Sequence, residues 1–468
     1  MSFSSRLSTL NDSTPFCLIA KEGVVRLFTG GMSRHAKLAE IPRKAEGKTV
    51  LASISMIPFS QMKERGFQVV DDGEKILTLT PETEDRVCKD EFLARVPQGD
   101  ALTLKADITY NMNDTEFAQT VHDVVHNEIR NGSGCNFLIS RCSYAELESV
   151  TYDKMLALFA RLLRNEFGAY MVYLFFDGET YFIGASPEGH LSIDKKVARM
   201  RPICGTLSKA LPDMKSALDA FVVDENEINE LFMVVDETLK MMMPLCPNGG
   251  DVLGPTLREM RSVIHTENLL EGRTDWDMID AFRSTMFAPT MVGSPMESAA
   301  RVIYKAEKGQ GRSYYSSAVL LLGNDEEGEE CLDSAITIRS AQISKDGQLR
   351  LQVGASIVRD SDPQKETEEV KAKIAGLLKA LTSDSNDQPI LPDLYSNQVE
   401  AKMLQRNGRL SNFWIENQSL ADMPKILKGK VICLINNEDD FVHMAAHLLQ
   451  HMGATTQVID IREFDELA

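Results

Sequence analysis

Two pairs of glutamates stand at a spacing that could hold a divalent cation. In "DPQKETEE" an Asp-Pro helix start precedes Glu366 and Glu369, which are three residues apart and share one helical face. "DENEINE" repeats the spacing with Glu227 and Glu230. One such pair is usually a solvated helix face. Two pairs facing each other across a cleft would instead present four carboxylates to one hard cation, and Mg²⁺ favours such oxygen ligands while leaving positions for an anionic substrate.

The charge of the chain excludes some partners. Lys and Arg number 50 against 69 Asp and Glu, a formal net charge of −19, which would repel a nucleic-acid backbone and an anionic membrane surface. The longest apolar run, "AYMVYLFF", is too short to cross a bilayer. The eight cysteines show no CxxC pairing, which favours reduced thiols. We therefore expect a soluble, cytoplasmic protein with neither nucleic acid nor membrane as a partner.

Helical and strand patterns are intermixed along the chain. "NDTEFAQTVHDVVHNEIRNG" predicts a capped amphipathic helix, followed by a strand over "CNFLISR". Further helices are expected near 152–166 and 224–243, with a strand pair in "YMVYLFFDGETYFIGAS" between them. "SSAVLLLG", "DSAITIRS" and "LRLQVGASIV" then follow one another almost as hairpins. This succession predicts an α+β fold, with large antiparallel sheets in two layers and flanking helices.

A Ser-, Asp-, Asn- and Pro-rich stretch, "LTSDSNDQPILPDL", marks a boundary in the chain. We expect an N-terminal part over 1–110 with short strands and turns, a main part over 111–382, a linker over 383–427 and a C-terminal segment over 428–468. The last segment reads as strand, helix and strand, the opening βαβ of a parallel-sheet domain. It is too short to bury both faces of such a sheet. Three interpretations of this segment stay open: a truncated domain, a degenerate remnant of one, or half of a domain that a partner completes.

Eight motifs occur between about residues 115 and 380 in a recognisable order. They are "IGASPEGHL", "RPICGTL", "DENEINE", "VIHT", "TMVGSP", "YYSSAV", "AITIRS" and "VGASIVRDSDPQKETEE". In this order they resemble the chorismate-utilising enzymes, namely the anthranilate, aminodeoxychorismate, isochorismate and 2-amino-2-desoxyisochorismate synthases. The C-terminal segment is similar to the start of a class I glutamine amidotransferase. The resemblance implies a chorismate-binding catalytic domain over 111–382, Mg²⁺ as cofactor, and ammonia supplied from glutamine by an amidotransferase domain or a separate subunit. A homodimer stays open.

The resemblance also implies roles for the acidic residues. Glu230 and Glu369 would hold Mg²⁺ against the ring carboxylate of chorismate, with Glu366 and the catalytic Glu227 in the same cluster. Glu188 would protonate the C4 hydroxyl as it leaves, which requires a raised pKa. Taken without the family, Glu188 would be an ordinary turn or cap acid.

Further roles follow from the same resemblance. His265 would lie beside the leaving hydroxyl, although a histidine between apolar residues is more often a core histidine. The remaining catalytic candidates are Thr290 and Asn136. Arg339 and Tyr315 would bind the enolpyruvyl carboxylate. Other substrate contacts would come from Gly205, Thr206, Gly354, Ser356 and Lys373, the last of which also stands where it could pair with Glu369 on one helix.

Two positions bear on the nucleophile. Asn136 stands where isochorismate synthases carry a lysine that activates water, and Cys204 stands where aminodeoxychorismate synthases carry a nucleophilic lysine. An amide cannot deprotonate water but can hydrogen-bond an amine, so ammonia is the better nucleophile. "GQGRS" at 309–313 imitates a phosphate loop, but it lacks the strand before it and the helix after it.

We therefore expect amination of chorismate at C2, with release of 2-amino-2-desoxyisochorismate for specialised metabolism of the phenazine type. "PFCLIAKEG" stands where tryptophan-regulated relatives carry "LLES", so feedback by tryptophan is not expected. Anthranilate synthase component I, which also eliminates pyruvate, is the alternative, and His265 keeps it open. A catalytically silent chorismate-binding scaffold is a further alternative.

Overall fold

The computed structural model describes the chain in eight ranges. They are residues 3–45, 49–96, 99–246, 249–261, 263–325, 327–383, 397–406 and 424–461. Most of the linker predicted over 383–427 lies outside the described residues. Within it, a short helix, α11 (Asn397–Arg406), packs against strand β12 of the main sheet.

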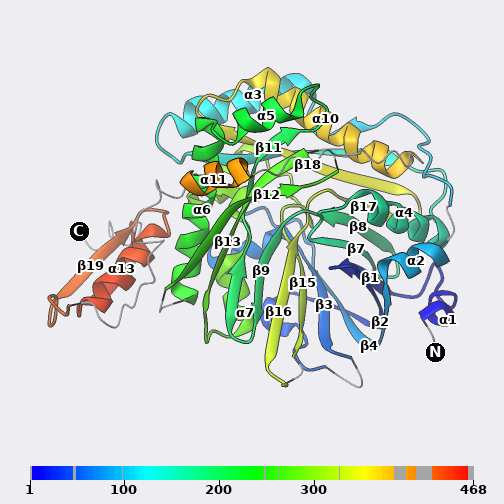
Figure 1. The fold of residues 1–468 in the computed structure, drawn as a ribbon, viewed down its shortest axis with the longest axis horizontal. Helices are drawn as coiled ribbons and strands as arrows, with labels where there is room; N and C mark the ends of the chain where they lie inside the picture. The colour runs from blue at the N-terminus through cyan, green and yellow to red at the C-terminus, as the bar shows by residue number, and fades with distance from the viewer. Residues whose placement is uncertain are drawn as a thin grey trace.

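Eighteen strands of the described residues are hydrogen-bonded into one sheet system that fills the middle of the molecule (Figure 1). Each pairing within it is antiparallel, which confirms the expected mixture of helices with a large antiparallel sheet. The strands are β1 (Phe16–Lys21), β2 (Val24–His35), β3 (Leu51–Ile57), β4 (Ile76–Cys88), β5 (Thr109–Tyr110), β6 (Asn136–Glu146), β7 (Met171–Phe176), β8 (Thr180–Ser186), β9 (Gly189–Asp194), β10 (Val197–Met200), β11 (Ile203–Ser208), β12 (Gly250–Glu259), β13 (Val263–Arg273), β14 (Gly293–Ser294), β15 (Ala318–Asn324), β16 (Glu330–Ile336), β17 (Ser340–Ser344) and β18 (Gln348–Val358).

Helices cover the ends and sides of this sheet system (Figure 1). α3 and α10 contact each other, and α10 also packs on β18, while α6 packs on β11 and β13. The helices are α1 (Phe3–Leu7), α2 (Lys89–Arg95), α3 (Asp114–Asp123), its π-helical continuation η3 (Val124–Ile129), α4 (Tyr152–Asn165), α5 (Met214–Phe221), α6 (Glu225–Leu245), α7 (Met278–Thr285), α8 (Pro289–Val292), α9 (Met296–Ala306) and α10 (Pro363–Thr382), with short 3-10 turns η1 (Leu38–Glu40) and η2 (Phe59–Arg65).

The amphipathic helix expected after residue 113 is present as α3 and η3. Its first turn is capped reciprocally, because the Glu116 N–H donates to the Asn113 side chain at 3.0 Å and the Asn113 N–H donates to Glu116 Oε2 at 2.8 Å. Phe117 and Val121 on its apolar face are fully buried. The exit at Gly132 has a φ of 87°, a left-handed conformation that glycine adopts without a Cβ clash.

The N-terminal strands are interleaved with later ones. β1 pairs with β7, and β3 pairs with β15 more than 250 residues later. β2 and β4 are 12 and 13 residues long, so the expectation of only short strands before residue 110 was wrong for this pair. The register shifts between Thr29 and Gly30, and the residues of β2 after this shift are half-buried or exposed, so the strand lacks a continuous apolar pattern.

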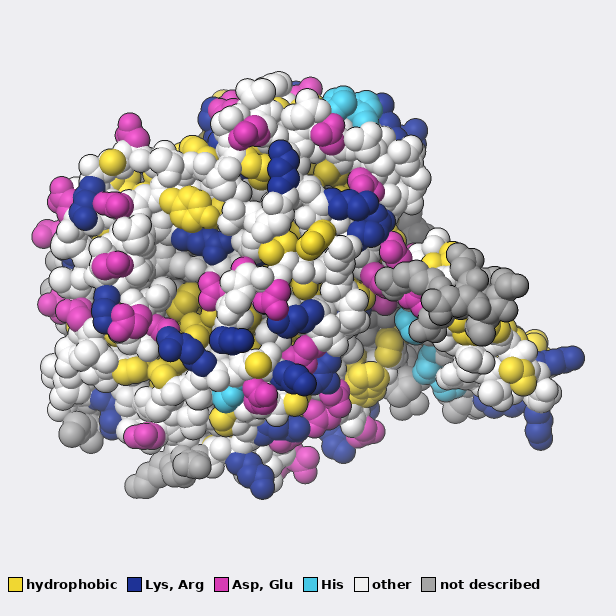
Figure 2. All heavy atoms as spheres, turned by 180° about the vertical axis from the view of Figure 1, so that it is seen from behind, with side chains coloured by type: hydrophobic (Ala, Val, Ile, Leu, Met, Phe, Trp, Pro, Cys, Tyr) yellow, Lys and Arg dark blue, Asp and Glu magenta, His cyan; other side chains and the backbone are white. Residues whose placement is uncertain are grey.

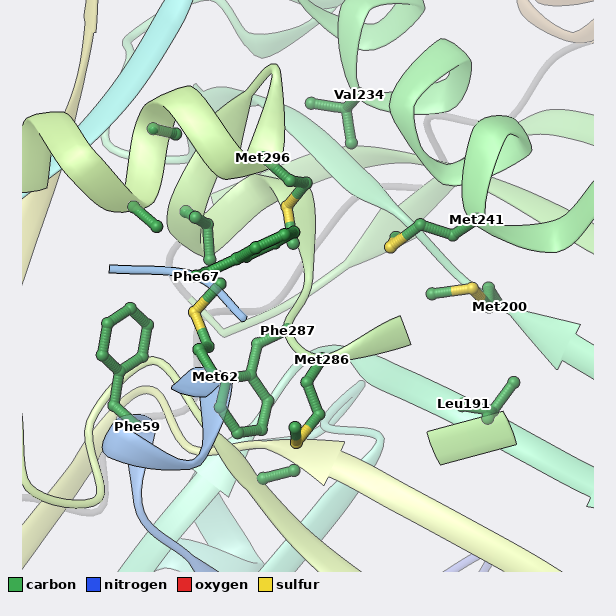
Figure 3. Close-up of a cluster of buried hydrophobic side chains, with 14 of the residues drawn as sticks. Phe59, Met62, Phe67, Leu191, Met200, Val234, Met241, Met286, Phe287 and Met296 are labelled. Atoms are coloured by element: carbon green, nitrogen blue, oxygen red, sulfur yellow. The ribbon is translucent and has the colours of Figure 1, made fainter. Parts of the chain in front are cut away.

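A cluster of methionine and phenylalanine side chains anchors the turn between α7 and α8. Figure 3 shows Phe59 and Met62 of η2 beside Met286 and Phe287. The rings of Phe59 and Phe287 stack with their centroids 5.9 Å apart, and all four side chains are buried. Flexible methionines fill the irregular space between the rings. This packing fixes the start of α8, the helix that carries Thr290.

The C-terminal segment forms a separate small unit beside the body. β19 (Val431–Asn436) and β20 (Thr455–Asp460) pair in parallel, with α13 (Phe441–His451) between them in sequence, so the expected strand, helix and strand are present. In Figure 2 the unit projects from a body whose visible surface mixes acidic and basic side chains. A cavity of about 980 Å³ lies between unit and body. The body contacts of three consecutive acidic residues are Glu438 with Arg301, Asp439 with Lys240, and Asp440 with Arg65.

Two further expectations concern the whole chain. All eight cysteines lie among the described residues and are free thiols, four of them buried. None of the helices in the described ranges combines the length and apolar character needed to span a membrane. The domain division and the likeness of the C-terminal unit to an amidotransferase stay predictions.

Candidate active site

Glu188 is a buried acid in the turn between β8 and β9. Only 4% of its surface is exposed, and Thr290 Oγ1 lies 3.0 and 3.1 Å from its two carboxylate oxygens. Burial raises the pKa of Glu188 to about 8, against the opposing effect of the hydrogen bonds from Thr290 and from the Ile203 backbone. Glu188 is therefore mostly protonated at neutral pH and can donate a proton.

A second glutamate faces this acid from β13. The negative charge of Glu267 raises the pKa of Glu188 further, while Arg258 acts in the opposite direction. Arg258 Nη1 lies 3.0 Å from both carboxylate oxygens of Glu267 and so holds that charge in place. Glu267 was not among the sequence candidates. It lies two residues after His265 on β13, where alternate residues share one face of the sheet, but no strand was expected there from the sequence.

His265 is neutral and held at both ring nitrogens. Its Nδ1 lies 2.7 Å from the carbonyl oxygen of Gly205, and its Nε2 lies 3.0 Å from Arg339 Nη2. Since a carbonyl only accepts and a guanidinium only donates, Nδ1 carries the proton and Nε2 accepts. Burial, followed by the charge of Arg339, lowers the pKa of His265 to about 4. Thr206 Oγ1 lies 3.3 Å from Nδ1 at the same corner.

Gly205 lets a glutamate of α6 approach β11. Its φ is 68°, and a Cβ built at this position would lie 2.6 Å from Glu227 Oε2. A larger residue would therefore both strain the backbone and displace the Glu227 carboxylate. The carbonyl of Gly205 is the group that fixes the tautomer of His265, so one residue contacts both the acidic cluster and the histidine.

Three of the four expected carboxylates interact electrostatically. Burial raises the pKa of Glu230, and Glu369 raises it further, whereas a hydrogen bond with the Cys204 thiol lowers it. Burial likewise raises the pKa of Glu366, with added repulsion from Glu369 and Glu230. α6 and α10 thus bring together residues that lie more than 130 positions apart. The contact with Cys204 was not foreseen, because the sequence marked Cys204 only as the place of an absent lysine.

Lys373 supplies positive charge at this cluster. Its Nζ lies 2.6 Å from Glu369 Oε1 and 3.2 Å from the carbonyl oxygen of Gly354. As the side chains stand, the described residues contain no group of three or more His, Cys, Asp and Glu placed to hold a metal ion. The donors nevertheless fit Mg²⁺ chemically, since they are carboxylate oxygens in mutual electrostatic contact.

Tyr315 and Asn136 lie on the remaining side of the candidate site. Tyr315 packs in a buried apolar cluster with Leu138, its hydroxyl is hydrogen-bonded by the Gly354 backbone, and burial raises its pKa to about 12. Asn136 begins β6 and is 4% exposed, and its Oδ1 has no hydrogen-bond partner among the described residues. Ser356 pairs with Leu138 across β18 and β6. An unpaired buried amide oxygen is a ready acceptor for an N–H group.

The structure therefore assembles most of the candidates in groups. The contacts join Glu188 with Thr290; Gly205 with Glu227; His265 with Gly205, Thr206 and Arg339; Glu230 with Glu366 and Glu369; Lys373 with Glu369 and Gly354; and Tyr315 with Gly354. Asn136 and Ser356 stand on the neighbouring strands β6 and β18, without a direct contact to Glu188 or His265 among the described contacts.

Comparison with known proteins gives the class. The chorismate binding enzyme family matches residues 34–379, and the chain belongs to this family. It is 38% identical over 456 residues to the phenazine-specific anthranilate synthase of Pseudomonas chlororaphis, covering 95% of this chain and 70% of that protein. The phenazine-specific anthranilate synthase of Pseudomonas fluorescens is also 38% identical, over 97% of this chain and 71% of its own length.

Solved structures share the fold. The menaquinone-specific isochorismate synthase of Escherichia coli superimposes with a TM-score of 0.66 at 21% identity, covering 82% of this chain and 92% of that one. Anthranilate synthase component I of Streptococcus pneumoniae gives a TM-score of 0.62, also at 21% identity, over 78% and 90% of the two chains. At this level of identity the likeness concerns the fold.

Proposed function

We propose that the protein aminates chorismate at C2 with loss of the C4 hydroxyl and releases 2-amino-2-desoxyisochorismate. The observation that carries the proposal is Glu188, a buried glutamate whose raised pKa keeps its carboxyl group protonated at neutral pH. Departure of a hydroxyl from chorismate requires a proton on the leaving oxygen. Glu188 gives that proton, and Thr290 orients its carboxyl group through both oxygens.

Asn136 receives the nucleophile. The buried, unpaired Oδ1 accepts a hydrogen bond from ammonia and holds its lone pair toward the substrate ring. An amide cannot act as a base toward water at this position, so the isochorismate reaction is disfavoured. Ammonia comes from glutamine through an amidotransferase, either in the same polypeptide or in a separate subunit. The phenazine-specific names of two relatives at 38% identity favour the same chemistry.

The substrate carboxylates are bound at two places. Glu230, Glu366 and Glu369, with Glu227 beside them, would hold Mg²⁺, which when bound neutralises the ring carboxylate and withdraws electron density from the ring. Arg339 and Tyr315 bind the enolpyruvyl carboxylate, assisted by backbone amides near Gly205 and Gly354. His265, being neutral, leaves the positive charge of Arg339 available for the substrate.

Anthranilate is the second candidate product. It requires a base that removes the C2 proton while pyruvate leaves, and the unprotonated Nε2 of neutral His265 is such a base once Arg339 turns to the substrate. The two relatives from Pseudomonas are named anthranilate synthases, which supports anthranilate as the second candidate product.

The experiment combines the protein with chorismate, an ammonium salt and Mg²⁺. We expect the chorismate absorbance to fall only when all three are present, and mass spectrometry to find a product that retains the pyruvyl group. A fluorescent product that lacks this group would establish anthranilate instead. Unchanged chorismate, with binding detected by calorimetry, would establish a silent chorismate-binding protein.

A further inference from the structure

Arg312 lies in "GQGRS", the stretch that imitates a phosphate loop, and it is buried in the core instead of binding a phosphate. Its side chain is 1% exposed and forms an ion pair with Glu307, whose side chain is 2% exposed. Arg312 Nη2 lies 2.6 Å from Glu307 Oε1, and Nε lies 3.0 Å from Oε2. The guanidinium also lies over the ring of Phe59, 4.7 Å from its centroid.

The remaining N–H groups of Arg312 reach three separate segments. Nη2 donates to the carbonyl of Leu138 at 2.7 Å, and Nη1 donates to the carbonyl of Met291 at 3.0 Å and to Ser316 Oγ at 3.3 Å. All five N–H donors of the guanidinium therefore have acceptors. A lysine could not satisfy this set, because its three donors diverge from a single atom.

Glu307 adds a second contact to β6 and, through Ser140, links the network to a fourth segment, β18. Its Oε1 accepts from the Ser140 N–H at 2.8 Å and from Ser140 Oγ at 2.7 Å. Gln352 Nε2 in turn donates to Ser140 Oγ at 2.8 Å. Strands β6 and β18 are thus joined by side chains as well as by their backbone ladder, at the level of the Arg312 pair.

Each tied residue stands next to a candidate site residue. Leu138 lies two positions after Asn136 on one strand face, Met291 follows Thr290, Ser316 follows Tyr315, and Gln352 lies two positions before Gly354. The Arg312–Glu307 pair therefore sets the relative placement of four segments whose side chains would contact chorismate or the proton-donating Glu188.

We propose that Arg312 is a positioning residue for the amination of chorismate, acting through Leu138, Met291 and Ser316, with Glu307 as its counter-charge. This inference rests on the proposed function. A fully buried ion pair contributes little net stability, because desolvation offsets most of the attraction, and apolar side chains of similar volume would serve the core as well. Positional definition, which catalysis needs to within a fraction of an ångström, explains the pair better.

A second buried arginine provides the matched control. Arg141 is also 1% exposed and lies on β6, but it donates to the carbonyl of Met112 and to Asp114 and stacks on Tyr110, none of which is a site residue. Arg312→Lys and Arg141→Lys therefore each remove a buried guanidinium group, Arg312 from the loop before β15 and Arg141 from β6. We expect both to lower Tm by a similar amount.

Kinetics separate the two variants. Arg312→Lys should lower kcat about 100-fold, the loss that displacing catalytic groups by about an ångström can cause, with KM for chorismate changed less than about threefold. Arg141→Lys should keep kcat within about twofold. A kcat for Arg312→Lys that also stays within about twofold, while the wild type is active, would overturn the inference without touching the proposed function.

An infrared measurement provides a readout independent of turnover. The C=O stretch of protonated Glu188, assigned by its loss in Glu188→Gln, is followed from pH 6 to pH 10. Displacement of Thr290 in Arg312→Lys removes hydrogen bonds that favour the ionised carboxylate, so the midpoint should rise above that of the wild type. The midpoint in Arg141→Lys should not move. An unmoved midpoint in Arg312→Lys contradicts the inference even if the wild type fails to aminate chorismate.

If Arg312→Lys does not fold, Ser316→Ala removes the hydrogen bond from Arg312 to Ser316 Oγ, together with the hydrogen bond between the Ser316 side chain and Tyr315. We expect kcat to fall several-fold, because Tyr315 then loses one restraint, while Tm changes by roughly a degree or two. Unchanged kcat in this variant would contradict the inference as well.

Discussion

Glutamates at the two ends of the site carry raised pKa values for different reasons. Glu188 is buried, and desolvation outweighs the effects of its hydrogen bonds and of the charges of Glu267 and Arg258, so that its pKa reaches about 8. Burial also raises the pKa values of Glu230 and Glu366. Each of these residues has further carboxylates as neighbours, which raise its pKa, while the charge of Lys373 lowers it. The first environment stores a proton. The second concentrates negative charge, which the proposed Mg²⁺ would neutralise.

The two ends also differ in what holds them. Glu188 sits in a strand turn braced by Thr290 and by the Arg312 network, and its neighbours are backbone segments of the sheet. The carboxylate cluster comes from two helices, and Glu369 and Lys373 in it are about half exposed. The same residue type is thus kept protonated where a sheet buries it, and gathers negative charge where two helices bring several carboxylates together.

Glu188→Gln should have the largest effect. Loss of the general acid is expected to lower kcat by roughly a thousandfold, within the usual range for proton transfer. Initial rates of chorismate loss, with circular dichroism to check folding, measure this. A variant with more than about a tenth of wild-type kcat would remove Glu188 from the acid role.

The same variant should be more stable than the wild type in alkaline buffer. The pKa of Glu188 is raised on folding, so its contribution to stability is fully present below the unfolded value and is lost as pH rises toward about 8, where the unfolded state has already released its proton. Glutamine carries no such dependence. Tm at pH 8 should therefore rise in Glu188→Gln by roughly a few degrees, as measured by calorimetry at pH 5 and pH 8.

Glu369→Gln tests the other end. Removing one charged ligand should weaken the apparent affinity for Mg²⁺ by roughly 100-fold, as judged by the Mg²⁺ concentration that gives half-maximal rate, and should nearly abolish turnover at low Mg²⁺. Excess Mg²⁺ should restore part of the rate here but none in Glu188→Gln. Identical Mg²⁺ dependence in the variant and the wild type would argue against a cation at Glu369.

The pH profile gives an intermediate effect. In the proposed mechanism the protonated form of Glu188 is the active one. Because its pKa is about 8, kcat should fall about tenfold for each pH unit above that value. His265, with a pKa near 4, should add no change between pH 6 and pH 8. A profile that falls on the acid side of pH 7 would point to a base other than these two residues.

Lys373→Met should have the smallest effect. If Lys373 contacts a substrate carboxylate, KM for chorismate should rise roughly fivefold with kcat nearly unchanged, because uniform binding is lost. If Lys373 only pairs with Glu369, KM should stay constant and the apparent Mg²⁺ affinity should improve. Steady-state kinetics at several Mg²⁺ concentrations separate the two roles.

Local patterns in the sequence were enough to predict several elements. The capping residues and apolar spacing of α3, the alternating runs of the late strands, and the two ExxE pairs are all local signals. The motif order supplied the family. The pairing of β1 with β7 and of β3 with β15 has no local signal, because it depends on which strands the whole chain leaves adjacent.

The surroundings of Glu188 could not be predicted from the sequence either, because they also depend on long-range contacts. Nothing near Glu188 in sequence indicates that Thr290 donates to it or that Glu267 faces it. Thr290 lies 102 residues further along the chain, and the approach of Glu267 depends on how the strands pair in the sheet. Arg312 was hidden because its motif resembled a loop, while its five acceptors come from segments up to 174 residues away.

The interleaving of early and late strands has a consequence for synthesis of the protein on the ribosome. β3 can pair with β15 only after β15 has been synthesised, and β6 can pair with β18 only after more than 200 further residues have been added. Until then the nascent chain exposes strand edges that attract other extended chains. Such long-range closure makes folding slow, so yield in the cell should depend on chaperones that shield those edges during translation.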